Sequence, residues 1–260
     1  MFQGKTNLDA PVFSVIVPVH NAAQTLPATL NSLRAQSFEN WEAILVDDAS
    51  SDGSLAILQT ACAEDPRMRL LHDPAQKRAR QVAATRNLGL AQARGDFVAF
   101  LDADDRWMPE KLAAQHEAFE QGADIVFSSY RRVDENGLSK GVVRAKPVVT
   151  WENALSGNPI GCSTGAYRRT RFAQARMPVD TLPEDYVFWL SLMREGGVAV
   201  GLPQVLAEYR VSPGSRSANK LASAIGVWRA LGQQEIGLVK RLRGFSGYLG
   251  SGVMRRLASR

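Results

Sequence analysis

The sequence has few of the residues that build disulfide scaffolds or histidine metal centres. Its two cysteines, Cys62 and Cys162, lie far apart and fit no metal-ligand spacing, so we expect free thiols in a reducing compartment. The three histidines, His20, His72 and His116, have no mutual spacing that indicates a metal site or a proton relay, and each is expected to be incidental. The chemistry of the chain is therefore expected to rest on other side chains.

Long apolar runs are also missing. No stretch approaches the roughly 20 residues that cross a bilayer, and the first ten residues, "MFQGKTNLDA", lack the apolar centre of a signal peptide. The sequence therefore predicts a cytoplasmic protein. With 260 residues, 45% of them hydrophobic and 22% charged, the chain is long enough to bury a core as one large domain or two small ones.

Acidic residues are nearly absent from the C-terminal end. Residues 216–260 hold nine Lys or Arg residues and one acid, Glu235, which gives this segment a formal charge of +8. Since the whole chain carries +5, residues 1–215 carry −3. The basic character of the protein belongs to its tail.

Short β-branched runs alternate with helical spacings in the first half. "FSVIVPV" and "WEAILVDD" read as strands, and the leucines at positions 26, 30 and 33 between them predict a helix. The alternation continues with helices near 54–63 and 79–93 and strands near 68–72 and 97–102. It predicts an α/β fold with a mostly parallel sheet covered by helices, in which ligands bind beyond the carboxyl ends of the strands.

The second half has a mixed pattern. We expect a helix near 110–121, a hairpin of strands near 125–131 and up to 143 that turns at Asn136-Gly137, a helix over 183–197, and a strand in "QVLAEYRV". The segment "SPGSRSAN", residues 212–219, is the plausible linker, and a helical appendage is expected after it.

Three aspartates crowd the end of the strand predicted in "GDFVAFLDADDRW". In extended backbone Asp102 and Asp104 point the same way and present carboxylates to one cation, while Asp105 points elsewhere. Such oxygen ligands suit Mg²⁺ or Mn²⁺. A D-x-D alone is more often a solvated turn that caps a helix, but its place after a buried strand favours the metal. An EF-hand is excluded by Trp107 and Ala113 at its sixth and twelfth positions.

Three stretches together carry a family resemblance: "SVIVPVHNAAQTLPATLNSLRAQSFENWEAILVDDASSDGS", "ATRNLGLAQARGDFVAFLDADDRW" and "PEDYVFWLSLMREGG". From residue 12 to about 230, the chain resembles the inverting family 2 glycosyltransferases of bacterial surface-polysaccharide synthesis. The resemblance implies a GT-A, Rossmann-like fold. It divides the chain into an extension (1–10), a nucleotide-sugar-binding half (11–105), an acceptor-binding and catalytic half (106–215) and a basic helical tail (216–260).

The resemblance implies a donor site at the strand ends of the first half. Pro18 and Asn21, at the exit of the first strand, would border a nucleotide base, and Asp48 would accept a hydrogen bond from uracil or ribose. The alternative for Asp48 is an N-cap of the next helix. Arg86 would support the acids or touch the donor, and a structural salt bridge is an equal alternative. Lys77, Arg78 and Arg80 stand where relatives commonly carry Asn and Gly.

The implied catalytic residues follow. Asp102 and Asp104 would hold the donor, with Asp104 as metal ligand. The pair Glu184-Asp185 matches the acidic pair of the family, with Asp185 as general base and Glu184 as the acid that favours the helix N-terminus. Arg210 falls in a segment of leaving-group contacts, where this chain has Ser212 in place of the family's His.

The resulting hypothesis is a metal-dependent inverting transferase. It would move sugar from a nucleotide-diphosphate donor, with UDP preferred, to a saccharide or polyprenyl-linked acceptor of an exopolysaccharide, capsule or lipopolysaccharide. A sugar nucleotidyltransferase is the rival enzyme, but "PVHNAAQTL" lacks a Gly-rich phosphate loop with a basic residue. A non-catalytic, membrane-associated nucleotide-sugar-binding scaffold is the other rival, which the complete set of acids disfavours.

The tail shows two apolar stripes at helical spacing. Leu221, Ala224, Ile225, Trp228 and Leu231 form the first, which predicts packing on the catalytic domain or on a partner chain of an oligomer. Phe245, Leu249, Val253 and Leu257 form the second, and the basic residues beside it suit an anionic membrane surface at the inner face of the plasma membrane. Glycines weaken this helix in isolation, so we expect it to order on lipid or protein. No nucleic-acid-reading module accompanies the basic residues.

Overall fold

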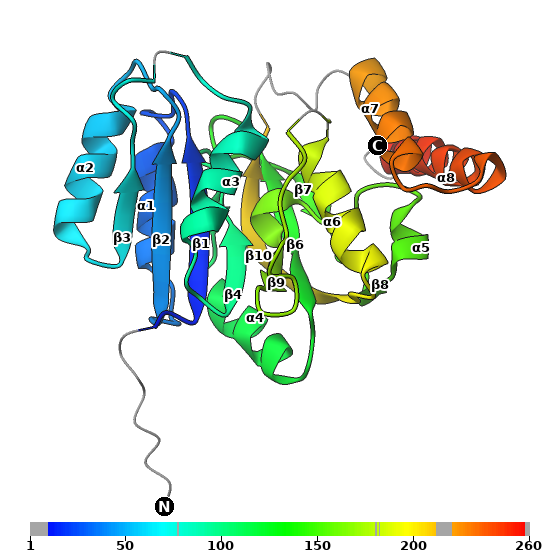
Figure 1. Cartoon of the computed structure of the whole chain (residues 1–260), viewed down its shortest axis with the longest axis horizontal. Helices are drawn as coiled ribbons and strands as arrows, with labels where there is room; N and C mark the ends of the chain where they lie inside the picture. The colour runs from blue at the N-terminus through cyan, green and yellow to red at the C-terminus, as the bar shows by residue number, and fades with distance from the viewer. Residues whose placement is uncertain (1–9, 77, 180, 182, 212–219, 258–260) are drawn as a thin grey trace, which may run out of the picture.

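The computed structural model describes residues 10–76, 78–179, 181, 183–211 and 220–257. These residues form an α/β structure built on one ten-stranded sheet (Figure 1). The main path of the sheet runs β3-β2-β1-β4-β9-β6-β10-β5, with β7 added to β6 and β8 added to β10. The α/β fold and the mostly parallel first half are confirmed. Strands β3, β2, β1 and β4 pair in parallel, and so do β6 and β10.

The strands are short and largely buried in the first half. Their bounds are Phe13–Val19 (β1), Trp41–Asp47 (β2), Met68–Leu71 (β3), Phe97–Phe100 (β4), Arg106–Trp107 (β5), Ile125–Val133 (β6), Ser139–Val143 (β7), Val148–Val149 (β8), Ala166–Arg168 (β9) and Ala199–Arg210 (β10). Every residue of β1, β2 and β4 is buried, as expected for strands covered on both faces.

Helices cover both faces of this sheet (Figure 1). They span Leu26–Arg34 (α1), Ser54–Glu64 (α2), Val82–Gln92 (α3), Lys111–Glu120 (α4), Trp151–Ala154 (α5), Glu184–Arg194 (α6), Lys220–Gly232 (α7) and Leu238–Leu257 (α8), with a 3₁₀ turn at Cys162–Thr164 (η1). One apolar cluster joins one face of the sheet to α3, α6 and α7. The other cluster joins the opposite face to α1, α2 and α4.

Helix α3 lies unusually close to the sheet. A Cβ on Gly89 would stand 2.6 Å from the Ile16 side chain of β1, so only glycine fits there without a shift. This close approach packs α3 on β1 and β2, and Arg86 in its first half reaches Asp102 after β4.

Three boundaries differ clearly from the sequence-based expectation. The strand predicted in "QVLAEYRV" begins five residues earlier, because β10 pairs with β6 from Ala199 onward. Strand β4 ends at Phe100, and residues 102–105 form a turn in which the Asp105 amide donates to the Asp102 carbonyl. Helix α3 begins at Val82 rather than near residue 79, because the preceding backbone is extended and the Arg80 amide is used by Asp48. The Asn136-Gly137 turn is confirmed, with Gly137 at φ 79°.

The C-terminal helices match the predicted stripes in part. Helix α7 packs on the apolar cluster beside α6, and Leu231 of the predicted stripe is buried there with Val227 and Ala230, while Ile225 of the stripe is 45% exposed. Phe245 of α8 packs on Trp228 and Tyr248, whereas Leu249 is exposed. The side chains of Leu221, Val253 and Leu257 and the predicted linker at 212–219 lie outside the described residues.

The glycines of α8 have a packing function that the sequence did not reveal. A Cβ on Gly244 would stand 2.8 Å from the Leu155 carbonyl oxygen, and one on Gly247 would stand 2.7 Å from the Ser156 hydroxyl. The glycines therefore let α8 pack closely against the segment that follows α5. None of the described helices combines the length and apolar character needed to cross a bilayer.

Candidate active site

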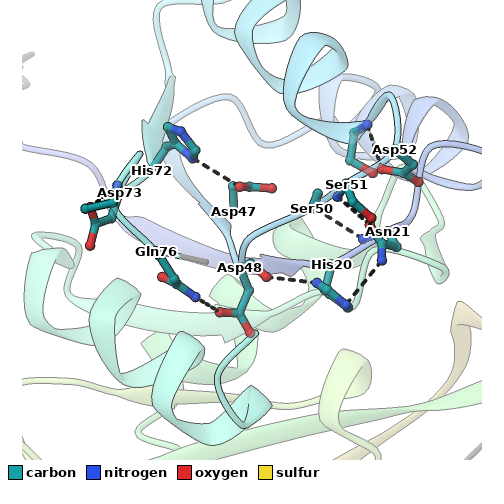
Figure 2. A network of polar contacts seen from close by, with 12 residues as sticks. His20, Asn21, Asp47, Asp48, Ser50, Ser51, Asp52, His72, Asp73 and Gln76 are labelled. Atoms are coloured by element: carbon teal, nitrogen blue, oxygen red, sulfur yellow. Dashed lines mark hydrogen bonds and ion pairs between the residues drawn. The ribbon is translucent and has the colours of Figure 1, made fainter. Parts of the chain in front are cut away.

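The loops after β1 and β2 are held together by a network of polar contacts (Figure 2). The His20 ring bonds the Asp48 carbonyl oxygen at 2.8 Å and faces the Asn21 amide at 3.3 Å. The Asn21 side chain accepts from the Ser51 amide at 2.8 Å, and Asn21 itself lies at φ 49°. Asn21 therefore fixes the shape of this rim, and its amide points toward the β2–α2 loop. His20 is not incidental, because it joins the two strand ends.

Asp48 is a buried carboxylate at the end of β2. It accepts from the Gln76 amide at 2.6 Å and from the Arg80 backbone amide at 2.9 and 3.0 Å, and the Arg80 guanidinium lies 3.5 Å away. No bond to the start of α2 is formed; Asp52 takes that place and accepts from the Ser54 amide. Asp47 instead bonds His72 at 3.1 Å, so His72 is likewise not incidental.

The aspartate turn after β4 separates its three carboxylates. Asp104 is exposed, Asp102 is half-buried and Asp105 is buried. The Arg210 amide donates to Asp105 at 3.0 Å, and the Arg210 guanidinium donates to the Asp104 carbonyl at 3.2 Å and to the Glu135 carbonyl at 2.8 Å. Arg210 thus ties β10 to the turn. Burial, reinforced by Asp102 and Asp104, raises the pKa of Asp105 well above its ordinary value.

The strand geometry given for the D-x-D prediction is therefore wrong. Asp102 and Asp104 do not alternate along a strand, because the strand has already ended and the chain turns. The prediction that Asp105 points elsewhere is correct: its side chain faces the interior and holds the backbone of Arg210. The Ser163 hydroxyl accepts from the Asp102 amide at 3.1 Å and supports the turn from η1.

Arg86 is a buried hub that joins two acids from distant segments. Its guanidinium donates to Asp102 at 2.5 Å and to Glu184 at 3.0 Å, and only 2% of the residue is exposed. The two carboxylates stabilise the charged form and keep the pKa of Arg86 above its ordinary value although burial opposes it. Of the alternatives for Arg86, the salt bridge that supports the acids is the one observed. It brings the start of α6 next to the aspartate turn.

Asp185 lies at the first turn of α6 beside Glu184. One oxygen accepts from the Asn158 amide at 3.0 Å, and the other accepts from the Tyr186 backbone amide at 2.8 Å. Burial and the neighbouring Glu184 raise the pKa of Asp185 to about 6. Both acids lie in the first turn of α6, where Asp185 takes the contact with the Tyr186 amide and Glu184 takes the buried salt bridge with Arg86.

A cleft of about 1280 Å³ opens along this edge of the sheet. Its walls come from the ends of β1 and β2, the segment before α3, the start of α6, and α7. Of the predicted residues, Pro18, Asp48 and Glu184 line it. Asn21, Asp102, Asp104, Asp185 and Arg210 are outside this lining, although Asp102 is linked to it through Arg86 and Glu184.

Several cleft and site residues were missed by sequence reasoning. Gln76 and Arg80 come from the stretch that departs from the family pattern. The basic run at 77–80 was the signal for Arg80, and Gln76 precedes that run. Asn158 lies in a loop that carries no pattern, and Arg229 lies in a tail interpreted through its apolar stripe. Their positions depend on how segments distant in the sequence pack together, and local residue spacing does not predict that packing.

The fit of a divalent cation depends on the exposed aspartate. Within the described ranges, no group of three or more His, Cys, Asp or Glu side chains is arranged to hold a metal by itself. Mg²⁺ commonly takes one or two protein carboxylates and completes its shell with substrate phosphates and water. The exposed Asp104, next to Asp102, suits that kind of site.

The chain is similar to known glycosyltransferases along most of its length. Residues 14–175 match the family model described as glycosyl transferase family 2. The chain is 37% identical over 221 residues to the putative teichuronic acid biosynthesis glycosyltransferase TuaG of Bacillus subtilis, which covers 84% of this chain and 86% of that protein. It is 32% identical over 228 residues to the glucosyltransferase WfgD of Escherichia coli, over 86% of this chain and 87% of that protein.

Solved structures agree on the fold. S. aureus TarS in complex with UDP-GlcNAc superimposes with a TM-score of 0.71 at 21% identity, over 91% of this chain and 71% of that one. A mannosyltransferase from Pyrobaculum calidifontis in complex with GDP-Man and Mn²⁺ gives 0.68 at 19% identity, over 94% and 76%. The fold is that of the GT-A glycosyltransferases, and the nucleotidyltransferase alternative is set aside. Because the fold, the family model over residues 14–175 and these relatives agree, the chain belongs to the family 2 glycosyltransferases.

Proposed function

We propose that this enzyme transfers a sugar from a UDP-sugar to a lipid-linked saccharide during synthesis of a bacterial surface polysaccharide. The observation that carries the proposal is the buried Arg86, which holds Asp102 of the aspartate turn and Glu184 of α6 in one cluster beside Asp185. This cluster brings the acids expected to handle the donor next to the acid expected to activate the acceptor. A binding scaffold without turnover would not need that arrangement.

The chemistry is a single displacement with inversion. The acceptor hydroxyl attacks the anomeric carbon, the bond from that carbon to the diphosphate oxygen breaks, and the nucleoside diphosphate leaves with the bonding electrons. Asp185 takes the hydroxyl proton. A carboxyl group whose pKa is about 6 is ionised at neutral pH and still basic enough to accept a proton in the transition state. Asp48 and Pro18, which line the cleft, would hold the base and ribose of the donor.

Asp104, with Asp102 beside it, would hold a divalent cation together with the donor diphosphate. When bound, Mg²⁺ or Mn²⁺ supplies positive charge that compensates the diphosphate as it leaves. Arg86 does not take over that task, because its guanidinium is already engaged by Asp102 and Glu184. Its role in the proposal is to keep these two acids in place.

The substrates are proposed from the relatives. WfgD is named as an enzyme that uses UDP-Glc and a GlcNAc-diphosphoundecaprenol, and TarS was solved with UDP-GlcNAc and with UDP. TuaG is named for teichuronic acid biosynthesis. These names support a UDP-sugar, a lipid-diphosphate acceptor and a surface polysaccharide as substrates and product of this chain.

The same acceptor class supports a peripheral position on the cytoplasmic face of the membrane. Helix α8 exposes Leu238 (64%), Val239 (82%), Leu242 (49%) and Leu249 (49%). Lys240 and Arg243 are exposed beside them. An exposed apolar face with basic neighbours is the pattern of a helix that lies in an anionic lipid interface. Of the stripe predicted from sequence, this face keeps Leu249 and loses Phe245, which packs on Trp228.

Two substitutions test the proposed function. Asp185→Asn is expected to leave UDP binding intact and to lower transfer, or hydrolysis of a UDP-sugar, by roughly 10²-fold or more, because the amide accepts no proton.

Asp104→Ala is expected to abolish the gain in UDP affinity that Mn²⁺ provides, measured by calorimetry with and without the ion.

The matched control is Glu64→Ala, which removes an exposed carboxylate paired with Arg34 on the outer helices. Normal transfer by Asp185→Asn would move the base elsewhere, with Glu184 the next candidate. Metal-dependent UDP binding that survives Asp104→Ala would contradict the metal assignment. Failure of the unmodified protein to bind any nucleotide sugar would overturn the proposal as a whole.

A further inference from the structure

We propose that Arg229 of α7 binds the diphosphate of the lipid-linked acceptor. The inference rests on the proposed function and deepens it, because it assigns a residue to the acceptor rather than to the donor. Arg229 belongs to the wall that α7 contributes to the cleft, opposite the ends of β1 and β2, and its side chain is exposed there. This wall lies outside the segment matched by the family model, which ends at residue 175.

The other charged groups of the cleft already have partners. Asp48 is paired with Arg80, and Glu184 is paired with Arg86. Arg241 donates twice to the Trp228 carbonyl, at 3.2 and 2.7 Å, and stacks on the Trp228 ring at 3.9 Å. The Arg229 side chain forms no ion pair or hydrogen bond with any residue that the structure describes, and only its backbone carbonyl accepts, from the Gln233 amide. Among the described residues of the lining, Arg229 is therefore the cation whose guanidinium is left for a ligand, and an anionic group is the partner that its chemistry calls for.

Helix α7 is held firmly enough to present this cation. Its Val227, Ala230 and Leu231 are buried in the apolar cluster next to α6, and the Gln233 amide donates to the Thr181 hydroxyl at 2.7 Å. Gly232 leaves the space that Arg241 fills, since a Cβ there would stand 2.8 Å from the guanidinium. A side chain on such a helix is held in place with respect to the start of α6, so the cation does not depend on a loop for its position.

The order of the elements distinguishes the acceptor from the donor. Asp48 and Pro18 mark one wall of the cleft, and Glu184, next to Asp185, marks the start of α6. Arg229 comes from the helix that leads to α8, whose exposed face carries Leu238, Val239 and Leu242. An acceptor sugar at Asp185 with its lipid in the membrane would pass its diphosphate between these two places. Arg229 lies on that side of the cleft.

The experiment uses farnesyl diphosphate as a sugar-free probe of lipid diphosphates. The full chain is first saturated with UDP and Mn²⁺, so that the donor site is filled, and binding of the probe is then measured by calorimetry. We expect Arg229→Gln to weaken binding roughly tenfold or more, as for a lost charge-assisted hydrogen bond. Arg229→Lys should recover part of the affinity. Farnesol, which lacks phosphate, should not distinguish the variants.

Arg194→Gln is the matched control, because Arg194 is an exposed arginine of α6 whose partner is the exposed Glu235. It should bind the probe like the unmodified protein. The inference is overturned if the unmodified protein does not bind farnesyl diphosphate, if Arg229→Gln binds it as tightly, or if Arg229→Gln weakens UDP binding equally, which would place a donor phosphate at Arg229. A protein that binds no UDP at all contradicts the proposed function instead.

Discussion

At the residue scale, the two acids at the start of α6 carry the proposed chemistry. Glu184 and Asp185 are adjacent, yet the structure gives them different surroundings: Glu184 faces a buried guanidinium, whereas Asp185 faces an amide side chain and its own helix backbone. The ion pair holds Glu184 in place, whereas burial and the charge of Glu184 raise the pKa of Asp185 to about 6. Different surroundings thus separate a positioning acid from a candidate base.

The first prediction concerns Asn158, whose amide donates to Asp185. Removing this donor destabilises the carboxylate, so Asn158→Ala should raise the pKa of Asp185 and move the acidic limb of the transfer rate upward by roughly one to two pH units. The measurement is kcat/KM against pH. Asn158→Asp keeps the acceptor for the Ile160 amide and adds a like charge, so it should shift the limb further.

The acidic limb itself is expected near pH 6. Because the pKa of Asp185 is raised in the folded state, the folded protein takes up this proton more readily than the unfolded chain, and the fold gains stability as the pH falls from about 6 toward 3.8. A loss of rate in this pH window is therefore not caused by unfolding through Asp185. If the acidic limb of kcat/KM stays at the same pH in both Asn158 variants, a group other than Asp185 titrates there.

At the scale of elements, helix packing depends on positions where no side chain fits. Helix α3 needs Gly89 against β1, and α8 needs Gly244 and Gly247 against the segment after α5. These glycines cost helix propensity, which is why the tail was expected to order only on lipid or protein. The close packing they permit offsets that cost, so the helix is already formed against its own chain.

The second prediction compares two glycines of α8. Gly244→Ala puts a methyl group 2.8 Å from the Leu155 carbonyl oxygen, so it should lower the free energy of unfolding by about 1 kcal/mol or more. Gly250→Ala meets nothing within 4 Å and should stabilise the helix by roughly 0.5–1 kcal/mol. Denaturant unfolding of both variants checks the signs. Equal effects would show that α8 does not pack as described.

At the scale of the whole molecule, charge is separated along the chain. The tail from residue 216 carries +8, and residues 1–215 carry −3, so attraction to an anionic surface is expected from the tail. The exposed apolar side chains of α8 are found in the same region. The charge and these side chains support the proposed lipid contact at this end of the enzyme, and α7 contributes a wall of the site cleft.

The third prediction tests this surface without removing the helix, because Phe245 and Tyr248 pack against the core and a truncation would expose it. The double variant Leu238→Gln/Leu242→Gln should reduce sedimentation with vesicles of phosphatidylglycerol and phosphatidylcholine by roughly tenfold or more in partition coefficient. Leu138→Gln/Val142→Gln is the control. Leu138 is 63% exposed and Val142 is 41% exposed, close to the 64% of Leu238 and the 49% of Leu242. Hydrolysis of a soluble donor should not change in either variant.

Salt gives a second readout of the same interaction. Binding of the unmodified protein should weaken as ionic strength rises, since each basic residue near the surface contributes about 1 kcal/mol that salt screens. Equal sedimentation of both double variants would mean that the α8 face binds something other than lipid, and an oligomer would then be the next explanation to test.

The sequence alone determined the architecture and most of the residues of interest. Alternating β-branched runs and leucine spacing indicate a parallel, helix-covered sheet, and its strand ends locate Asp48 and the aspartate turn, because these signals are local and repeat along the chain. The acids of α6 follow from the family resemblance. The family resemblance extended this to a transferase. The sequence also located the Asn136-Gly137 turn, whose φ preference is a property of two residues.

Tertiary structure decided which of these residues meet and what each one faces. The Arg86 link to Asp102 and Glu184 joins residues 16 and 98 positions apart, and no local period encodes it. The bond from Asn158 to Asp185, the inward turn of Phe245 and the wall that Arg229 contributes depend on how α7 and α8 pack over the sheet. The physical reason is that spacing fixes which face of an element a residue occupies, whereas packing fixes what that face meets.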